Sequence, residues 1–137
     1  DYIGSRGLGD VYKRQILPCI ASGNRVVAVP SLKAALIVAD FYQLLDTSDV
    51  PGGVINLVTG IPSELATVLA AHDDVAAIWA VGPADECEQI KKESAGNLKS
   101  VWTLDGKSPD WYDSQAEGSS WLERATQVKN IWVPYGE

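Results

Sequence analysis

The chain has 137 residues, of which 46% are hydrophobic, and this is enough for one compact domain with a buried core. Its net charge of −7 argues against nucleic acid or an anionic membrane as a partner, and no apolar run approaches the roughly 20 residues of a membrane helix. Two cysteines and one histidine are too few for a disulfide framework or a structural zinc site, so we expect a cytoplasmic protein without a metal.

Residues 1–15 differ in composition from everything that follows them. They combine glycines with mixed charges and show neither the period of a helix nor that of a strand. Their last residues, LGDVYKRQ, resemble a translated adapter remnant, so we expect residues 1–15 to be a non-native or disordered leader. Gly4, Gly7 and Gly9 lack the G-x-G-x-x-G spacing of a phosphate-binding loop. The fold is therefore expected to begin at Ile16.

The next segment predicts a helix end, a strand and a second helix. Gly23-Asn24 is typical of a left-handed helix cap, and the apolar run at 25–29 predicts a strand. Ser31 can cap a helix that extends to about residue 45. Apolar residues recur in this helix at i, i+3, i+4 and i+7, namely Leu32, Ala35, Leu36 and Ala39. Further apolar residues widen this stripe and predict a well-buried helix: Ile37, Phe41, Leu44 and Leu45.

The stretch DVPGGVINLVTG, residues 49–60, predicts a turn, a buried strand and a second turn. Proline fixes φ and glycine accepts positive φ, so Pro51-Gly52-Gly53 forms the first turn. The continuous apolar run at 54–58 suits a strand that is covered on both faces, as in a parallel sheet. Gly60 ends the strand.

The alternation of helix and strand continues to residue 109. The sequence predicts a helix capped by Ser63, a strand at 75–81, a helix from Pro83 to about Gly96, and a strand at 98–104. Regular alternation of this kind indicates βαβ units with right-handed crossovers. We therefore predict that residues 16–109 form an α/β domain with a Rossmann-like parallel sheet and flanking helices.

Residues 110–137 have a different character and predict a linker followed by an arm. The segment after Pro109 is polar and rich in turn residues. Ser120 can cap a short helix, and residues 128–134 predict a last strand that proline ends. Tryptophans are expected to anchor this arm or a partner: Trp111, Trp121 and Trp132.

Five stretches of the chain resemble aldehyde dehydrogenases. They are ILPCIASGNRVVAVPS, DVPGGVINLVTG, IWAVGPADEC, WTLDGKSPD and LERATQVKNIWV. The first four follow each other at natural spacing. The last is similar to the family's carboxyl-terminal helix and strand, which contribute to subunit association, and it arrives with the catalytic domain missing before it. The resemblance implies that residues 16–109 are a degenerate cofactor domain and that residues 110–137 include an association arm.

The resemblance also locates a ribose-binding motif after the first strand, which this chain keeps only in part. In the family pattern K-P-S-E, the lysine and the glutamate hold the adenosine ribose of NAD or NADP. Only Pro30 and Ser31 remain here, because Val29 and Leu32 occupy the two charged positions. Lys33 lies nearby, although a solvated helix lysine is the simpler interpretation.

Two glycine motifs that approach the cofactor in the family are also reduced. Gly60 alone remains of the motif after the second strand. Gly82 alone remains after the third strand, where Pro83 replaces a serine and offers neither an N–H nor a hydroxyl to pyrophosphate. Asp85 and Glu86 add negative charge at this position. We expect weak or no NAD(P) binding, with a residual site composed of Pro30, Ser31, Gly60 and Gly82.

No catalytic residue of the family is found at its expected position. The general base is a glutamate in L-E-L-G-G-K, and Thr103 occupies that position. Asp105 lies two residues further on the same strand face and is an alternative base, although a turn residue at the strand end is the simpler interpretation. The nucleophile of the family is a cysteine further downstream, with which neither Cys19 nor Cys87 aligns.

Three interpretations of function remain. In the favoured one, the chain is a non-catalytic structural remnant that associates with itself or with an active dehydrogenase copy through its C-terminal strand, because an unpaired strand favours pairing with another chain. In the second, it is an excerpt of an active NAD(P)-dependent enzyme that oxidises aldehydes to carboxylic acids. In the third, it is a module that keeps a nucleotide pocket without chemistry.

Overall fold

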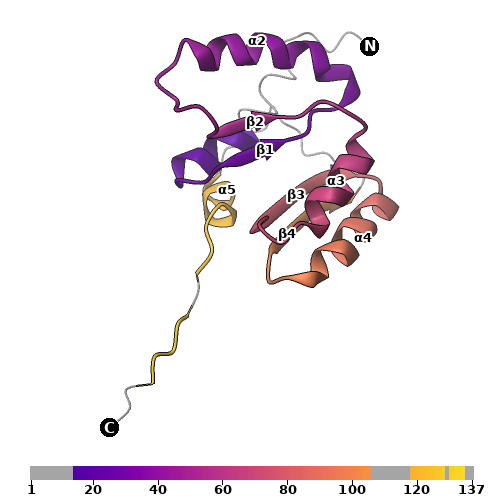
Figure 1. Ribbon diagram of the computed structural model, residues 1–137. Helices are drawn as coiled ribbons and strands as arrows, with labels where there is room; N and C mark the ends of the chain where they lie inside the picture. The colour runs from indigo at the N-terminus through magenta and orange to yellow at the C-terminus, as the bar shows by residue number, and fades with distance from the viewer. Residues whose placement is uncertain (1–13, 106–117, 129, 135–137) are drawn as a thin grey trace.

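The structure, a computed structural model, describes residues 14–105, 118–128 and 130–134 of the chain (Figure 1). Residues 14–21 are helical. The elements that follow are, in chain order, β1 (Val26–Ala28), the 3-10 helix η1 (Leu32–Ala34), α2 (Ala35–Asp46), β2 (Ile55–Leu57), α3 (Pro62–Ala71), β3 (Ala77–Gly82), α4 (Ala84–Glu93), the 3-10 helix η2 (Ser94–Gly96), β4 (Ser100–Asp105) and α5 (Ser119–Arg124).

The four strands form two parallel pairs. β1 pairs with β2 from Val26↔Ile55 to Ala28↔Leu57, and β3 pairs with β4 from Ala77↔Ser100 to Gly82↔Asp105. α2 connects the strands of the first pair and α4 connects those of the second, so each pair is a βαβ unit (Figure 1). The predicted α/β fold with parallel strands is confirmed, whereas the expected single sheet is divided, within the described residues, into two.

One face of the β3–β4 pair is covered by α3 and α4. Ala70 of α3, Ile90 of α4 and Ile78 of β3 form a buried cluster, against which Ala80 and Val101 of the two strands pack. Alternate residues of a strand point to the same face, which is why positions 78 and 80 share this core. The cluster is the main hydrophobic core of the second βαβ unit.

The opposite face of the β3–β4 pair carries three tryptophans in mutual edge contact. Trp79 and Trp102 are paired across the two strands, with their ring centroids 5.4 Å apart. Trp121 of α5 lies on both of them at 5.6 and 4.6 Å and is only 5% exposed. The Arg124 guanidinium lies 4.2 Å from the centroid of the Trp102 ring, a favourable cation–π distance. Trp121 therefore anchors the arm, as predicted, by covering the second face of a parallel strand pair.

The predicted buried face of α2 is wrong at Leu32, Leu36 and Ala39. Leu32 and Leu36 are 66% and 87% exposed, and Ala39 is also exposed. The helix buries Val38, which was not predicted, while Phe41 of the predicted face is half-buried. The side chains of residues 35 and 37 lie outside the described part of the structure. Apolar residues occur around much of this helix, so their spacing does not select one face, and the side that meets the strands decides which of them is buried.

Two predicted helix caps are also corrected. α3 begins at Pro62 with Ile61 as its N-cap, so Ser63 lies inside the first turn. α5 begins at Ser119 with Gly118 as its N-cap, which places Ser120 inside the helix. Proline has the φ of a first helical residue and needs no N–H there, so Pro62 starts α3 one residue before Ser63. The predicted left-handed glycine before β1 is confirmed, because Gly23 has φ of 79°.

The predicted strand at 128–134 is not formed in the described part of this segment. Residues 128 and 130–134 lie outside both strand pairs, and the segment extends away from the rest of the molecule (Figure 1). Val128, Ile131 and Trp132 are 91%, 83% and 92% exposed. A strand needs a neighbour to satisfy its backbone N–H and C=O groups, and an apolar sequence alone does not supply one.

The turn between α3 and β3 is held by residues that precede β4. The Lys99 ammonium donates hydrogen bonds to the carbonyl oxygens of Ala70 and, at 2.8 Å, of His72. The Asn97 amide donates to the Asp73 carbonyl at 2.8 Å. A lysine at the carboxyl end of a helix both satisfies terminal carbonyls and complements the helix dipole, so Lys99 fixes α3 against β4.

We expect Trp121→Ala to lower the free energy of unfolding by about 3–5 kcal/mol, because it removes a buried aromatic side chain and uncovers the two tryptophans beneath it. The matched control is Trp132→Ala, which should change stability by less than about 0.5 kcal/mol since that ring is exposed. Urea denaturation followed by circular dichroism measures both. Equal effects of the two substitutions would contradict the proposed anchoring role of Trp121.

We expect Lys99→Met to lower the free energy of unfolding by about 1.5 kcal/mol, because two helix-end carbonyls lose a charged donor. Lys92→Met on the exposed side of α4 serves as the control and should leave the urea midpoint almost unchanged. The expectation fails if the two lysine variants unfold at the same urea concentration.

Candidate functional site

The residues predicted to bind a cofactor all lie after the carboxyl ends of strands. Pro30 and Ser31 follow β1, Gly60 follows β2, and Gly82 is the last residue of β3. In open parallel sheets, ligands bind in the crevice outside the carboxyl ends of the strands. The topology thus places all four residues at the edge of the strands where a nucleotide would be expected. That these residues bind a nucleotide remains a prediction.

Each of these four residues has a distinct environment. Pro30 is fully buried, whereas Ser31 is exposed directly before η1. Gly60 packs against Leu65, since a Cβ placed on it would lie 2.9 Å from the Leu65 Cδ1 atom. A Cβ on Gly82 would lie 3.3 Å from the Glu86 carboxylate, so that side chain covers the end of β3.

The start of α4 is acidic and begins on a proline. Pro83 is the N-cap, with φ of −57° and ψ of 153°, and no side chain caps the helix. Asp85 and Glu86 occupy the first turn, and the basic residues of the helix are in its last turn. Carboxylates at a helix N-terminus interact favourably with the helix dipole, and this is the interaction that a bound anion would otherwise make.

A thiol, a carboxylate and an ammonium group meet between α4 and the end of β4. The Cys87 Sγ is buried and donates a weak hydrogen bond to the Gly82 carbonyl at 3.7 Å. The Lys91 Nζ lies 3.6 Å from the Asp105 Oδ2. The hydrogen bond from Cys87 is the main factor that lowers the pKa of Asp105, with Lys91 and Thr103 acting in the same direction. These contacts connect α4 with the carboxyl end of the β3–β4 pair.

The surroundings of this cluster move the pKa values of its thiol and its carboxylate away from neutrality. Burial, followed by the neighbouring Asp105 carboxylate, raises the pKa of the Cys87 thiol, and the thiol rather than the thiolate is then present at neutral pH. Burial also raises the pKa of Cys19. The lowered pKa of Asp105 makes its carboxylate a weaker base, which removes the main reason to regard it as a replacement for the missing glutamate.

The contact between Cys87 and Asp105 was not predicted from sequence. The two residues come from different elements, and only the packing of α4 on β4 brings them together. One feature of the sequence could have drawn attention to this contact. Asp105 lies at the carboxyl end of a predicted strand, where functional polar groups often lie in parallel sheets.

Two other kinds of site find no support in the described part of the chain. No group of three or more His, Cys, Asp or Glu side chains there could hold a metal ion. No helix among the described residues has the length and apolar character needed to cross a membrane.

Comparison with known proteins identifies the family. The sequence model described as "Aldehyde dehydrogenase family" matches residues 11–128. The chain belongs to this family. It is 39% identical over 93 residues to the (Z)-2-((N-methylformamido)methylene)-5-hydroxybutyrolactone dehydrogenase of Acinetobacter baylyi, a match that covers 67% of this chain and 19% of that protein. It is 38% identical over 96 residues to the 2-aminomuconic semialdehyde dehydrogenase of Mus musculus, covering 69% of this chain and 20% of that protein.

Solved structures agree with this assignment. An aldehyde dehydrogenase from Bartonella henselae superposes with a TM-score of 0.64 at 29% identity, over 69% of this chain and 20% of that one. The predicted α/β fold with parallel strands is thus the fold of a family member. The chain spans about a fifth of the length of the curated relatives it matches.

The position where the family resemblance implies a pyrophosphate is acidic in this chain. The family uses NAD or NADP, and one relative in Escherichia coli is named an NADP/NAD-dependent aldehyde dehydrogenase. Here the first turn of α4 carries Asp85 and Glu86, and the Glu86 carboxylate lies beside Gly82. Two carboxylates would repel a diphosphate, by about 1 kcal/mol each in a solvated site, and Pro83 removes a backbone donor.

We expect Asp105→Asn to lower the urea midpoint at neutral pH. The pKa of Asp105 is lowered in the folded state, so its ionised form stabilises the fold above about pH 4, and this contribution is lost as the pH falls through the lowered pKa. The difference between wild type and variant should therefore shrink on acidification. The exposed substitution Asp49→Asn is the control, and a difference that grows towards low pH would contradict the proposed pairing.

Proposed function

We propose that this chain is a non-catalytic, structural member of the aldehyde dehydrogenase family. The observation that carries the proposal is the cluster at the carboxyl end of the β3–β4 pair. Protein groups already satisfy one another there: Cys87 with Gly82 and Asp105, and Asp105 with Lys91. Charges that are paired within the protein, next to an acidic helix start, leave little to attract a dinucleotide phosphate.

In this proposal NAD or NADP binds weakly or not at all, and the residual contacts come from Pro30, Ser31, Gly60 and Gly82. Neither cysteine is an activated nucleophile in this proposal, since burial raises the pKa of both thiols. Asp105 is a weak base, since its pKa is lowered. We place the protein in the cytoplasm, because its sequence has two cysteines and both are free thiols.

The proposed role is association with an active aldehyde dehydrogenase copy or with a second copy of this chain. The C-terminal arm supports it, because α5 is firmly anchored through Trp121 while the residues beyond it are apolar and exposed. Exposed apolar chain next to a docked helix is typical of an interaction segment.

A second candidate is that the chain is an excerpt of an active NAD(P)-dependent dehydrogenase that oxidises aldehydes to carboxylic acids. The match over residues 11–128 and the coverage of about a fifth of each relative favour it. The two candidates make different predictions for the start of α4. An excerpt of an active enzyme would bind the cofactor pyrophosphate there in the full-length protein, whereas a non-catalytic member would not.

We expect the purified chain to give no NADH or NADPH above a buffer control with a panel of aliphatic and aromatic aldehydes. Isothermal titration with NAD should show no saturation at micromolar concentrations, because Asp85 and Glu86 repel the phosphates. The triple variant Pro83→Ser, Asp85→Ala, Glu86→Ala should bind NAD at least about tenfold more tightly than the parent chain, which corresponds to about 1.4 kcal/mol.

An active, full-length aldehyde dehydrogenase assayed in parallel confirms that the cofactor and aldehydes are competent. Turnover by the unmodified chain would overturn the proposal in favour of the second candidate. Saturable NAD binding without turnover would instead indicate a nucleotide-binding module.

A further inference from the structure

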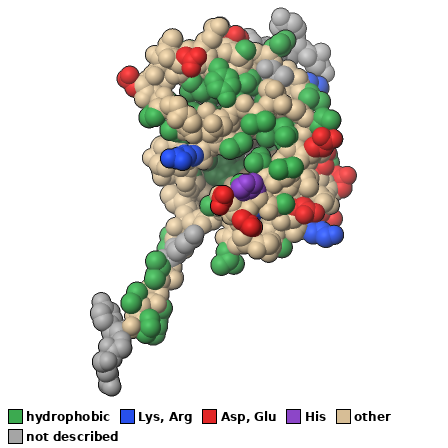
Figure 2. All heavy atoms as spheres, viewed as in Figure 1, with side chains coloured by type: hydrophobic (Ala, Val, Ile, Leu, Met, Phe, Trp, Pro, Cys, Tyr) green, Lys and Arg blue, Asp and Glu red, His purple; other side chains and the backbone are tan. Residues whose placement is uncertain are grey.

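We draw no further inference here: the strongest candidate, the hollow between the carboxyl end of α2 and the loop that leads into β2, which is lined by Tyr42, Asp46, Pro51 and Ile55 (Figure 2), carries none, because nothing in the described part of the structure shows what covers it.

Discussion

The structure depends on one requirement, that a parallel strand pair must be covered on both faces. α3 and α4 cover one face of β3–β4 through the cluster around Ile78, while a single helix covers the other through Trp121. α5 has only six residues and would not be stable alone, so its position is set by one tryptophan lying on two others. The helix α5 is consequently part of the fold of this chain.

The carboxyl ends of the strands show what this family member has retained and what it has lost. Glycines remain at positions 60 and 82, where the chain packs closely against Leu65 and Glu86. The charged groups nearby pair with each other at the surface, and the Cys87 thiol is buried beside them. Cys87 donates to the Gly82 carbonyl at the carboxyl end of β3 and lies beside Asp105, so the pKa of the thiol is raised and that of the carboxylate is lowered. The groups at this edge of the strands thus contact one another and contribute to the packing of α4 on β3 and β4.

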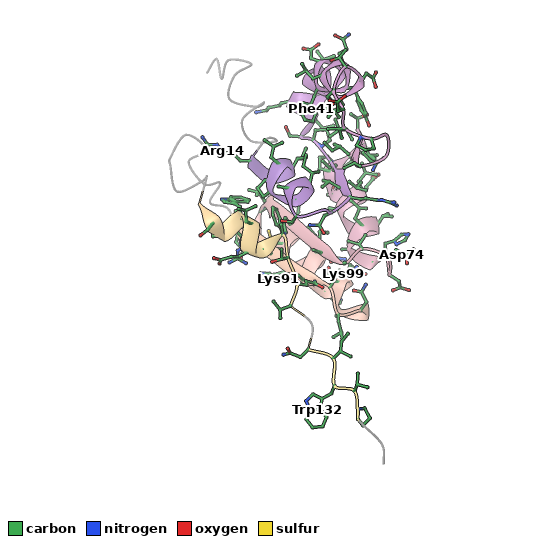
Figure 3. All side chains as sticks on the ribbon, turned by 90° about the vertical axis from the view of Figure 1, so that its left-hand side faces the viewer. Arg14, Phe41, Asp74, Lys91, Lys99 and Trp132 are labelled. Carbon is green, nitrogen blue, oxygen red and sulfur yellow. The ribbon has the colours of Figure 1, made fainter. Side chains whose placement is uncertain are left out.

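The strand pairs and the residues after α5 meet through a few polar contacts within the described residues. β1 pairs only with β2 there, and β3 only with β4. Ile131, Trp132 and Val133 are apolar and exposed and lie outside both pairs (Figure 3, where Trp132 is labelled). The side chains of Asn24 and Gln127 hydrogen-bond to the Ala125 and Ala76 carbonyls, which holds residues 125–127 beside the amino ends of β1 and β3.

The sequence by itself determined the family and the alternation of parallel strands and helices, because these depend on local period, on turn residues and on side-chain chemistry at known positions. Only the tertiary structure decided which face of α2 is buried, since Leu36 and Val38 are equally apolar and the strands select between them. It also decided that Cys87 meets Asp105 and that, among the described residues, Ile131, Trp132 and Val133 lie outside both strand pairs. Each of these depends on contacts between distant elements, and residue spacing along one element does not encode them.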